Sequence, residues 1–246
     1  MGFSLFHWGA GVLSILAALS PAQTATSKTV QLGATVENTR LEQDSKIAFV
    51  RVINRSERKI TAINLSVDIT FTNGKTDHFE QMLDLLTLIV SKQSQTGVAG
   101  EGVLAPGEGR EIRIDAVNPI SSIHSKVDMV AYLDLSAEVD QNQEALNRLV
   151  FQRKNRALAA RQIADVISEA AASSVTPDAS GMAVNRLRQM LDEAVSQQQG
   201  DQQIELRSAI ADLQSARAKS DLKGYAKQKN DAAVMSSAHA NVRRIN

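Results

Sequence analysis

The chain of 246 residues contains no cysteine. Disulfide bonds, thiolate nucleophiles and cysteine-ligated metal sites are therefore excluded at once. Aromatic residues make up only 4% of the chain, and the single tryptophan, Trp8, lies in a segment that we expect to be removed. A net charge is missing as well, because 27 basic residues balance 27 acidic ones. A general polyanion-binding protein is usually more basic than this, so nucleic acid is not an expected partner.

Motifs that gather catalytic or metal-binding residues are also missing. The four histidines, His7, His78, His124 and His239, form no H-x-x-x-H or H-E-x-x-H pattern, and neither G-x-S-x-G nor a P-loop occurs. These patterns are the usual local signs of a zinc site, a serine hydrolase or a nucleotide site. We therefore predict no catalytic residue, no cofactor and no metal ligand, which favours a non-enzymatic protein.

Four acidic residues lie close together in the sequence: Asp128, Asp134, Glu138 and Asp140. Their oxygens are of the kind that calcium prefers, but no D-x-D-x-D-G loop arranges them. Asp140 precedes a helical pattern and is suited to cap it. A helix cap and a solvated acidic end are therefore favoured over a calcium site.

The first 22 residues, MGFSLFHWGAGVLSILAALSPA, have the pattern of a secretory signal peptide. An apolar stretch from Val12 to Leu19 is followed by Ser20-Pro21-Ala22, a small-x-small cleavage site. The alternative is an uncleaved membrane anchor, although about 17 apolar residues are at the short end of what spans a bilayer. We predict cleavage after Ala22 and a periplasmic or extracellular protein, which meets the membrane only if this segment stays uncleaved.

Residues 28–140 show the two-residue alternation of β-strands. In INLSVDITFTNGK the odd-numbered residues from Ile63 to Phe71 are apolar, so we expect the odd face to be buried and the even face to meet water. Asn73-Gly74 predicts a type I′ turn and a return strand over 76–83. Further strands are expected in KTVQLGATV, SKIAFVRVIN, APGEGREIRIDAV and KVDMVAYLDL. Six or seven strands without helices between them predict an all-β antiparallel sandwich.

The connection over 85–103 is irregular, because it begins apolar and then becomes rich in glycine and serine. Long loops on sandwiches sometimes carry binding or catalytic groups. An envelope hydrolase or carbohydrate-active protein with its site in the 85–103 loop is therefore the alternative to a non-enzymatic protein. No pair of carboxylates can be nominated for such a site.

After Asp140 the composition shifts to Ala, Gln, Arg and Leu, and apolar residues recur every three to four positions. This spacing predicts about three helices over 141–222: one capped by Asp140, one after Pro177 and one after the polar break at Gly200. The pattern fades beyond residue 222, so we expect 223–246 to be frayed or disordered. Narrow, alanine-rich stripes bury little surface alone, and the helices should pack on one another, on the sandwich or on a partner chain.

Charge is unevenly distributed although its sum is zero. Residues 28–140 contain 12 basic and 16 acidic residues, a net charge of −4, whereas residues 141–246 contain 15 basic and 11 acidic residues, a net charge of +4. The two halves either attract each other or meet different partners.

The order of several segments resembles one group of proteins. NRSERKITAINLSVDITFTNGKT, LAPGEGREI and VDMVAYLDLSAEVD, followed by an arginine-rich helix, are similar to uncharacterised exported bacterial proteins with an immunoglobulin-like β-sandwich and a helical C-terminal tail. The resemblance covers the chain from Ile47 to Arg161. It implies that fold and an envelope setting, but no activity. The chain departs from the group at Asp134-Leu135-Ser136, where Asp-Gly is common.

These observations predict a signal peptide over 1–22, a β-sandwich domain over 28–140, a helical region over 141–222 and a frayed tail over 223–246. The favoured fold is an all-β immunoglobulin-like sandwich followed by about three helices. The favoured function is a non-catalytic exported structural or protein-interaction module, which binds a protein partner or itself through the helices.

Overall fold

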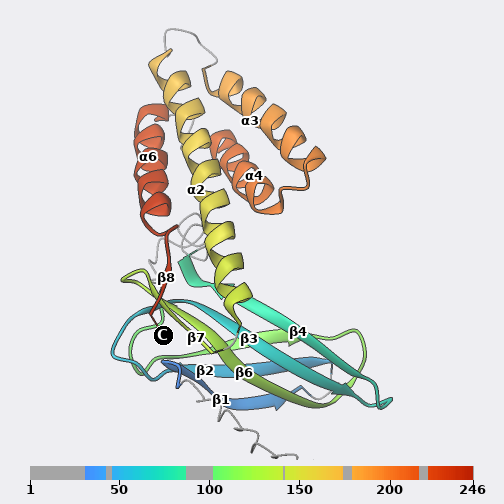
Figure 1. The fold of residues 1–246 in the computed structure, drawn as a ribbon. Helices are drawn as coiled ribbons and strands as arrows, with labels where there is room; N and C mark the ends of the chain where they lie inside the picture. The colour runs from blue at the N-terminus through green and yellow to red at the C-terminus, as the bar shows by residue number, and fades with distance from the viewer. Residues whose placement is uncertain are drawn as a thin grey trace, which may run out of the picture.

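The computed structural model describes residues 31–42, 46–86, 102–140, 142–173, 179–215 and 221–245. Two β-sheets face each other, and a group of helices extends away from them (Figure 1). One sheet has the strand order β1-β2-β5 and the other has the order β4-β3-β6-β7-β8. The strands are β1 (Ala34–Leu41), β2 (Ile47–Asn54), β3 (Ile60–Phe71), β4 (Thr76–Asp84), β5 (Gly109–Asp115), β6 (Ile120–Tyr132), β7 (Ser136–Val139) and β8 (Arg243–Arg244). The helices are α2 (Gln143–Ala172), α3 (Ala179–Ser196), α4 (Gly200–Gln214) and α6 (Leu222–Ala238).

The fold class is α+β, and the prediction of an all-β immunoglobulin-like antiparallel sandwich with about three helices is wrong. Four helices lie within the described ranges, and β8 pairs with β7 in parallel. The helices are also not a separate tail. The first turns of α2 pack on the outer face of the five-stranded sheet, where Ala145, Leu146 and Leu149 share a core with the sheet residues Ala62 and Met129.

The predicted hairpin between β3 and β4 is present, but its turn is of another type. The two strands pair in antiparallel register from Ala62 opposite Asp84 to Thr70 opposite Thr76. Gly74 has a φ of 79°, its N–H donates to the carbonyl of Phe71 over 2.9 Å, and the N–H of Phe71 donates to the carbonyl of Lys75 over 2.8 Å. A type I′ turn needs positive φ at two residues, and Asn73 does not have it. The connection is therefore a type I turn followed by a left-handed glycine.

The odd-numbered face of β3 is buried between the sheets as predicted, with Ile63, Leu65, Val67 and Ile69 at most 3% exposed. The prediction for the even-numbered face is wrong over its first half, because Ala62, Asn64 and Ser66 are buried as well. Only toward the hairpin does this face reach water, at Asp68. The cause is α2, whose first turns cover this end of the sheet.

Helix α2 belongs to two cores and so joins the two halves of the protein. Near its start it contributes Leu146 and Leu149 to the core on the outer face of the sheet. Further along, Ile163 and Ile167 pack with Leu187 of α3 and with residues of α4 and α6. Each such side chain contributes about 1.5–3 kcal/mol when it is fully buried. A third core fills the space between the sheets.

The predicted helix starts are close to the observed ones. The cap of α2 is Asn142, whose side-chain oxygen accepts from the N–H of Ala145 over 3.1 Å, so the prediction of Asp140 as the cap is wrong. Asp140 instead lies 3.5 Å from the Nζ of Lys126. Gly200, predicted as a break, is the first residue of α4.

The C-terminal residues differ from the predicted frayed or disordered tail over 223–246. Helix α6 begins at Leu222 with Asp221 as its cap. Beyond the helix, the N–H of Arg243 donates to the carbonyl of Leu135 over 2.8 Å, and the N–H of Ile245 donates to that of Ala137 over 2.9 Å. These bonds join the end of the chain to β7, more than 100 residues earlier, which no local pattern indicates.

Most of the 85–103 loop, residues 87–101, lies outside the described residues, as do residues 1–30. Its anchors are described: Leu85 and Leu104 are fully buried in the core between the sheets. Within the described ranges, no helix combines the length and the apolar character that a membrane span requires.

Candidate functional site

A buried ion pair joins the sheet to the helices. Asp84 is the last residue of β4, and Arg153 lies in α2. The Nη2 of Arg153 donates to Oδ1 of Asp84 over 2.9 Å, and its Nε donates to Oδ2 over 3.1 Å. The two side chains are only 4% and 5% exposed. This bidentate geometry is the strongest form of an arginine–carboxylate contact.

Further groups converge on the same point. The Nη2 of Arg153 also donates to the backbone and hydroxyl oxygens of Thr61 in β3, over 3.3 and 3.2 Å, and its Nη1 donates to the carbonyl of His239 over 3.4 Å. Arg156 lies 3.6 Å from Asp84 and 3.0 Å from Asp201 of α4. We call Thr61, Asp84, Arg153, Arg156 and His239 the junction cluster. It fixes α2, α4 and the end of α6 relative to the sheet.

The histidines do not form a catalytic or metal-binding group in the part of the chain that the structure describes. His239 belongs to the junction cluster, and its Nδ1 is buried without a hydrogen-bond partner. Burial lowers the pKa of His239, and the nearby charge of Arg153 lowers it further. His78 contacts Asp68 at 2.7 Å on the exposed face of the β3–β4 hairpin, far along the sheet from the junction. His239 therefore favours its neutral form. The neighbouring Arg153 is paired with the carboxylate of Asp84.

The opposite charges of the two halves of the sequence meet at this interface. Arg148 of α2 forms an ion pair with Glu80 of β4, and this hydrogen bond is the main reason that the pKa of Glu80 is lowered. One and two turns further on, Arg153 and Arg156 reach Asp84 of the same strand. Three arginines of the basic half thus pair with two carboxylates of the acidic half, so part of the charge asymmetry is used inside the molecule.

A second polar cluster lies at the same end of the sheets, where β3 begins and β6 ends. The Oε2 of Glu138 accepts from the hydroxyl of Tyr132 over 2.7 Å and from the N–H of Gly33 over 2.8 Å. The guanidinium of Arg58 forms an ion pair with Glu138 and stacks 3.5 Å over the ring of Tyr132. Burial, followed by the hydrogen bond to Glu138, raises the pKa of Tyr132 to about 12. This cluster ties the start of the described chain to β6 and β7.

The four acidic residues of the sequence do not converge on one point. Asp140 pairs with Lys126, Asp134 accepts from the N–H of Ser136 over 3.0 Å, and Glu138 belongs to the cluster just described. Asp128 is 4% exposed, so the expectation of a solvated acidic end is wrong for this residue. Over the described ranges, no group of three or more histidine, aspartate or glutamate side chains is placed to hold a metal ion.

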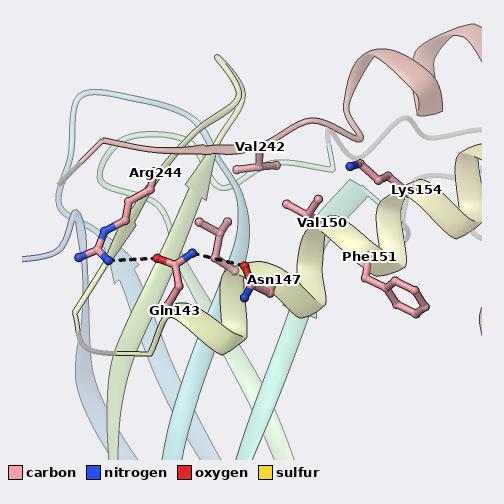
Figure 2. Close-up of a pocket in the computed structure, with 8 residues that line it drawn as sticks. Gln143, Asn147, Val150, Phe151, Lys154, Val242 and Arg244 are labelled. Atoms are coloured by element: carbon pink, nitrogen blue, oxygen red, sulfur yellow. Dashed lines mark hydrogen bonds between the residues drawn. The ribbon is translucent and has the colours of Figure 1, made fainter.

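A groove lies between the first turns of α2 and the C-terminal segment (Figure 2). It is an open hollow with a volume of about 430 Å³. Val150 and Val242 face each other across it, whereas the side chain of Phe151 projects outward from α2 at its rim (Figure 2). The residues that line it are Gln143, Leu146, Asn147, Val150, Phe151, Lys154, Val242 and Arg244. We call this hollow the α2 groove.

Two large apolar side chains continue from the groove along α2. Phe151 is 65% exposed and Leu158 is 59% exposed. They are seven residues apart, about two helical turns, and therefore share one face of the helix. The neighbouring faces of α2 are covered by α6 on one side and by α3 and α4 on the other (Figure 1). The exposed face is thus a strip between packed helices, and we call it the α2 strip.

No residue of this region was nominated from the sequence. The signal was present, because Phe151 and Leu158 are large apolar residues that fall outside the stripe formed by Leu146, Leu149 and Ile163. An apolar residue off the buried stripe of an amphipathic helix is a candidate contact residue. Whether another helix covers it depends on packing, which the sequence pattern does not specify.

Comparison with known proteins yields little for this chain. No protein-family model matches it, and no curated protein matches it at a significant level. One solved structure, a hypothetical protein from Peptoclostridium difficile 630, is similar with a TM-score of 0.31 and 11% sequence identity, covering 49% of this chain and 92% of that chain.

Proposed function

We propose that the protein is a non-catalytic, exported protein-interaction module, in which the sheets hold a helical platform and α2 presents the binding surface. The observation that carries the proposal is the pair Phe151 and Leu158, exposed by 65% and 59% beside the α2 groove. Large apolar side chains presented on a rigid element are typical anchors of protein interfaces. Here α2 is held rigid by two cores and by the junction cluster.

The roles of the buried charged groups support a non-catalytic module. Asp84 is occupied by Arg153, Glu138 by Arg58 and Tyr132, and Asp128 by Asn64 over 2.8 Å. Apart from the bond between Tyr132 and Glu138, each of these contacts joins segments that are distant in sequence. Such pairs specify how elements dock and leave no buried carboxylate poised for acid–base chemistry among those three.

The export part of the proposal rests on residues 1–22, which have an apolar stretch and a small-x-small site. Mass spectrometry of the mature protein, expressed with its full N-terminus, is expected to show a start near Gln23. A mature protein that begins at Met1 would contradict cleavage.

The interaction part is tested by photo-cross-linking in cells. A photoreactive amino acid at position 158, on the α2 strip, is expected to give a discrete adduct with a partner protein. The matched control is the same amino acid at position 117, because Val117 is 89% exposed but lies between β5 and β6, away from the helices. Identical adducts from both positions, or none from position 158, would refute the proposal.

A further inference from the structure

We infer that the partner contributes an amphipathic helix, which lies along the α2 strip with its acidic end in the α2 groove. This inference rests on the proposed function and specifies the chemistry of its ligand. It is drawn from the spacing of the exposed apolar residues and from the charges beside them.

The apolar contacts are arranged for a helix. Phe151 and Leu158 are about 10 Å apart along the axis of α2, the distance of two turns, and an apolar stripe on a facing helix repeats over the same distance. On α6, Val234 is 63% exposed and shares a face with Lys227, seven residues earlier. Tyr225 and Lys229, which bond to Asp212 of α4, lie on the opposite flank of α6. Val234 is therefore on the flank that borders the α2 strip.

The charges are basic at the groove end of this surface and mixed along the rest of it, because the exposed Asp165 lies seven residues after Leu158 and the exposed Asp231 lies between Lys227 and Val234 on α6. Lys154 is exposed between Phe151 and Leu158 and has no ion-pair partner among the described residues. The lining of the α2 groove includes Lys154 and Arg244 but no acidic residue. Arg161, one turn after Leu158, is exposed and pairs only with Asp165 on its own helix. Glutamates and aspartates at the end of a helix that enters the groove would complement Lys154 and Arg244.

The same charges disfavour two other occupants. A second copy of the chain that docked through the same face in a two-fold dimer would bring its own Lys154 and Arg244 toward these residues, and like charges in an interface are unfavourable. An anionic membrane would also attract Lys154 and Arg244, but it would be repelled by the exposed Asp165 and Asp231 further along the surface. Both occupants are included as outcomes of the test.

The test uses the purified mature chain and two fluorescent peptides of about 18 residues, five helical turns. Both peptides have leucines at helical spacing, and the flanking positions at one end carry glutamates in one peptide and lysines in the other. We expect the glutamate peptide to bind and the lysine peptide to bind at least about tenfold more weakly in fluorescence anisotropy. Lys154→Glu is expected to reverse this preference, and Phe151→Ala is expected to weaken binding of both peptides.

Lys75→Glu is the matched control for charge, because Lys75 is exposed in the β3–β4 hairpin, and Val117→Ala is the control for apolar truncation. Equal binding of the two peptides, or effects of the controls as large as those of Lys154→Glu and Phe151→Ala, would overturn the inference. Two further outcomes would overturn it if neither peptide bound. One is concentration-dependent dimerisation in light scattering that Phe151→Ala abolishes, and the other is binding to phosphatidylglycerol vesicles that Phe151→Ala abolishes.

The cross-linking experiment separates the two levels of the proposal. If the adduct from position 158 persists but the cross-linked partner segment is not acidic, the inference about the partner fails and the proposed function stands. If position 158 gives no specific adduct and neither peptide binds, the proposed function fails as well.

Discussion

Asp84 and Arg153, 69 residues apart in sequence, form a bidentate ion pair in which both side chains are at least 95% buried. The pair lies where β4 ends and α2 crosses the sheet, and Arg156 reaches the same carboxylate from one turn further along. Removal of Asp84 leaves the buried guanidinium of Arg153 without its carboxylate, whereas removal of both residues leaves no such charge. The pair therefore specifies how the helices dock rather than adding much net stability.

Asp84→Ala is expected to lower the free energy of unfolding by about 3–5 kcal/mol, because the guanidinium of Arg153 remains buried without its carboxylate. The double variant Asp84→Leu with Arg153→Met is expected to recover most of this loss. Urea denaturation followed by circular dichroism measures both. A double variant as unstable as the single one would show that the pair itself supplies the stability.

Gly33→Ala is expected to destabilise the fold by about 1–3 kcal/mol through steric overlap. A Cβ at residue 33 would lie 2.0 Å from the hydroxyl oxygen of Tyr132 and 2.9 Å from the Cβ of Ser56. Adding Tyr132→Phe removes the nearest atom, so the double variant should lose less than the sum of the two single changes. Gly200→Ala is the control, because a Cβ there meets nothing within 4 Å. Thermal unfolding that is unchanged by Gly33→Ala would argue against the contact.

Stability is expected to fall between about pH 10 and pH 12. The pKa of Tyr132 is raised from 10.0 to about 12 in the folded protein, so its contribution is complete below pH 10 and is lost as the pH rises toward 12. Tyr132→Phe should flatten the pH dependence of the denaturation midpoint in this range. Burial also raises the pKa of Tyr225, so the double variant Tyr132→Phe with Tyr225→Phe should be flatter still. An unchanged slope in Tyr132→Phe would contradict the assignment.

Leu135→Gly is expected to raise the melting temperature. Leu135 occupies the left-handed region with a φ of 67°, which costs an L-residue other than glycine about 1–2 kcal/mol, and glycine avoids this cost. The loss of a half-buried leucine side chain offsets part of the gain. Leu133→Gly, in the same turn but without positive φ, is the control and should lower the melting temperature. Calorimetry that ranks Leu135→Gly below Leu133→Gly would be contrary to this expectation.

The elements of this protein are largely encoded in local sequence. The alternation from Ile63 to Phe71 predicts β3, Asn73-Gly74 predicts the hairpin, and the three-to-four-residue rhythm after Asp140 predicts α2 to α4. These signals are readable because the period of a strand or helix depends only on residues a few positions apart.

The arrangement of these elements depended on contacts between distant residues. Three features arise because α2 and the C-terminal segment dock on the sheet. Asn64 is buried on a polar strand face, Asp84 pairs with Arg153, and the residues around Arg243 pair with β7. No local period distinguishes a polar strand face that meets water from one covered by a helix. For the same reason the sequence indicates that Phe151 and Leu158 lie off the main stripe of their helix, whereas only the packing of α3, α4 and α6 left that strip uncovered.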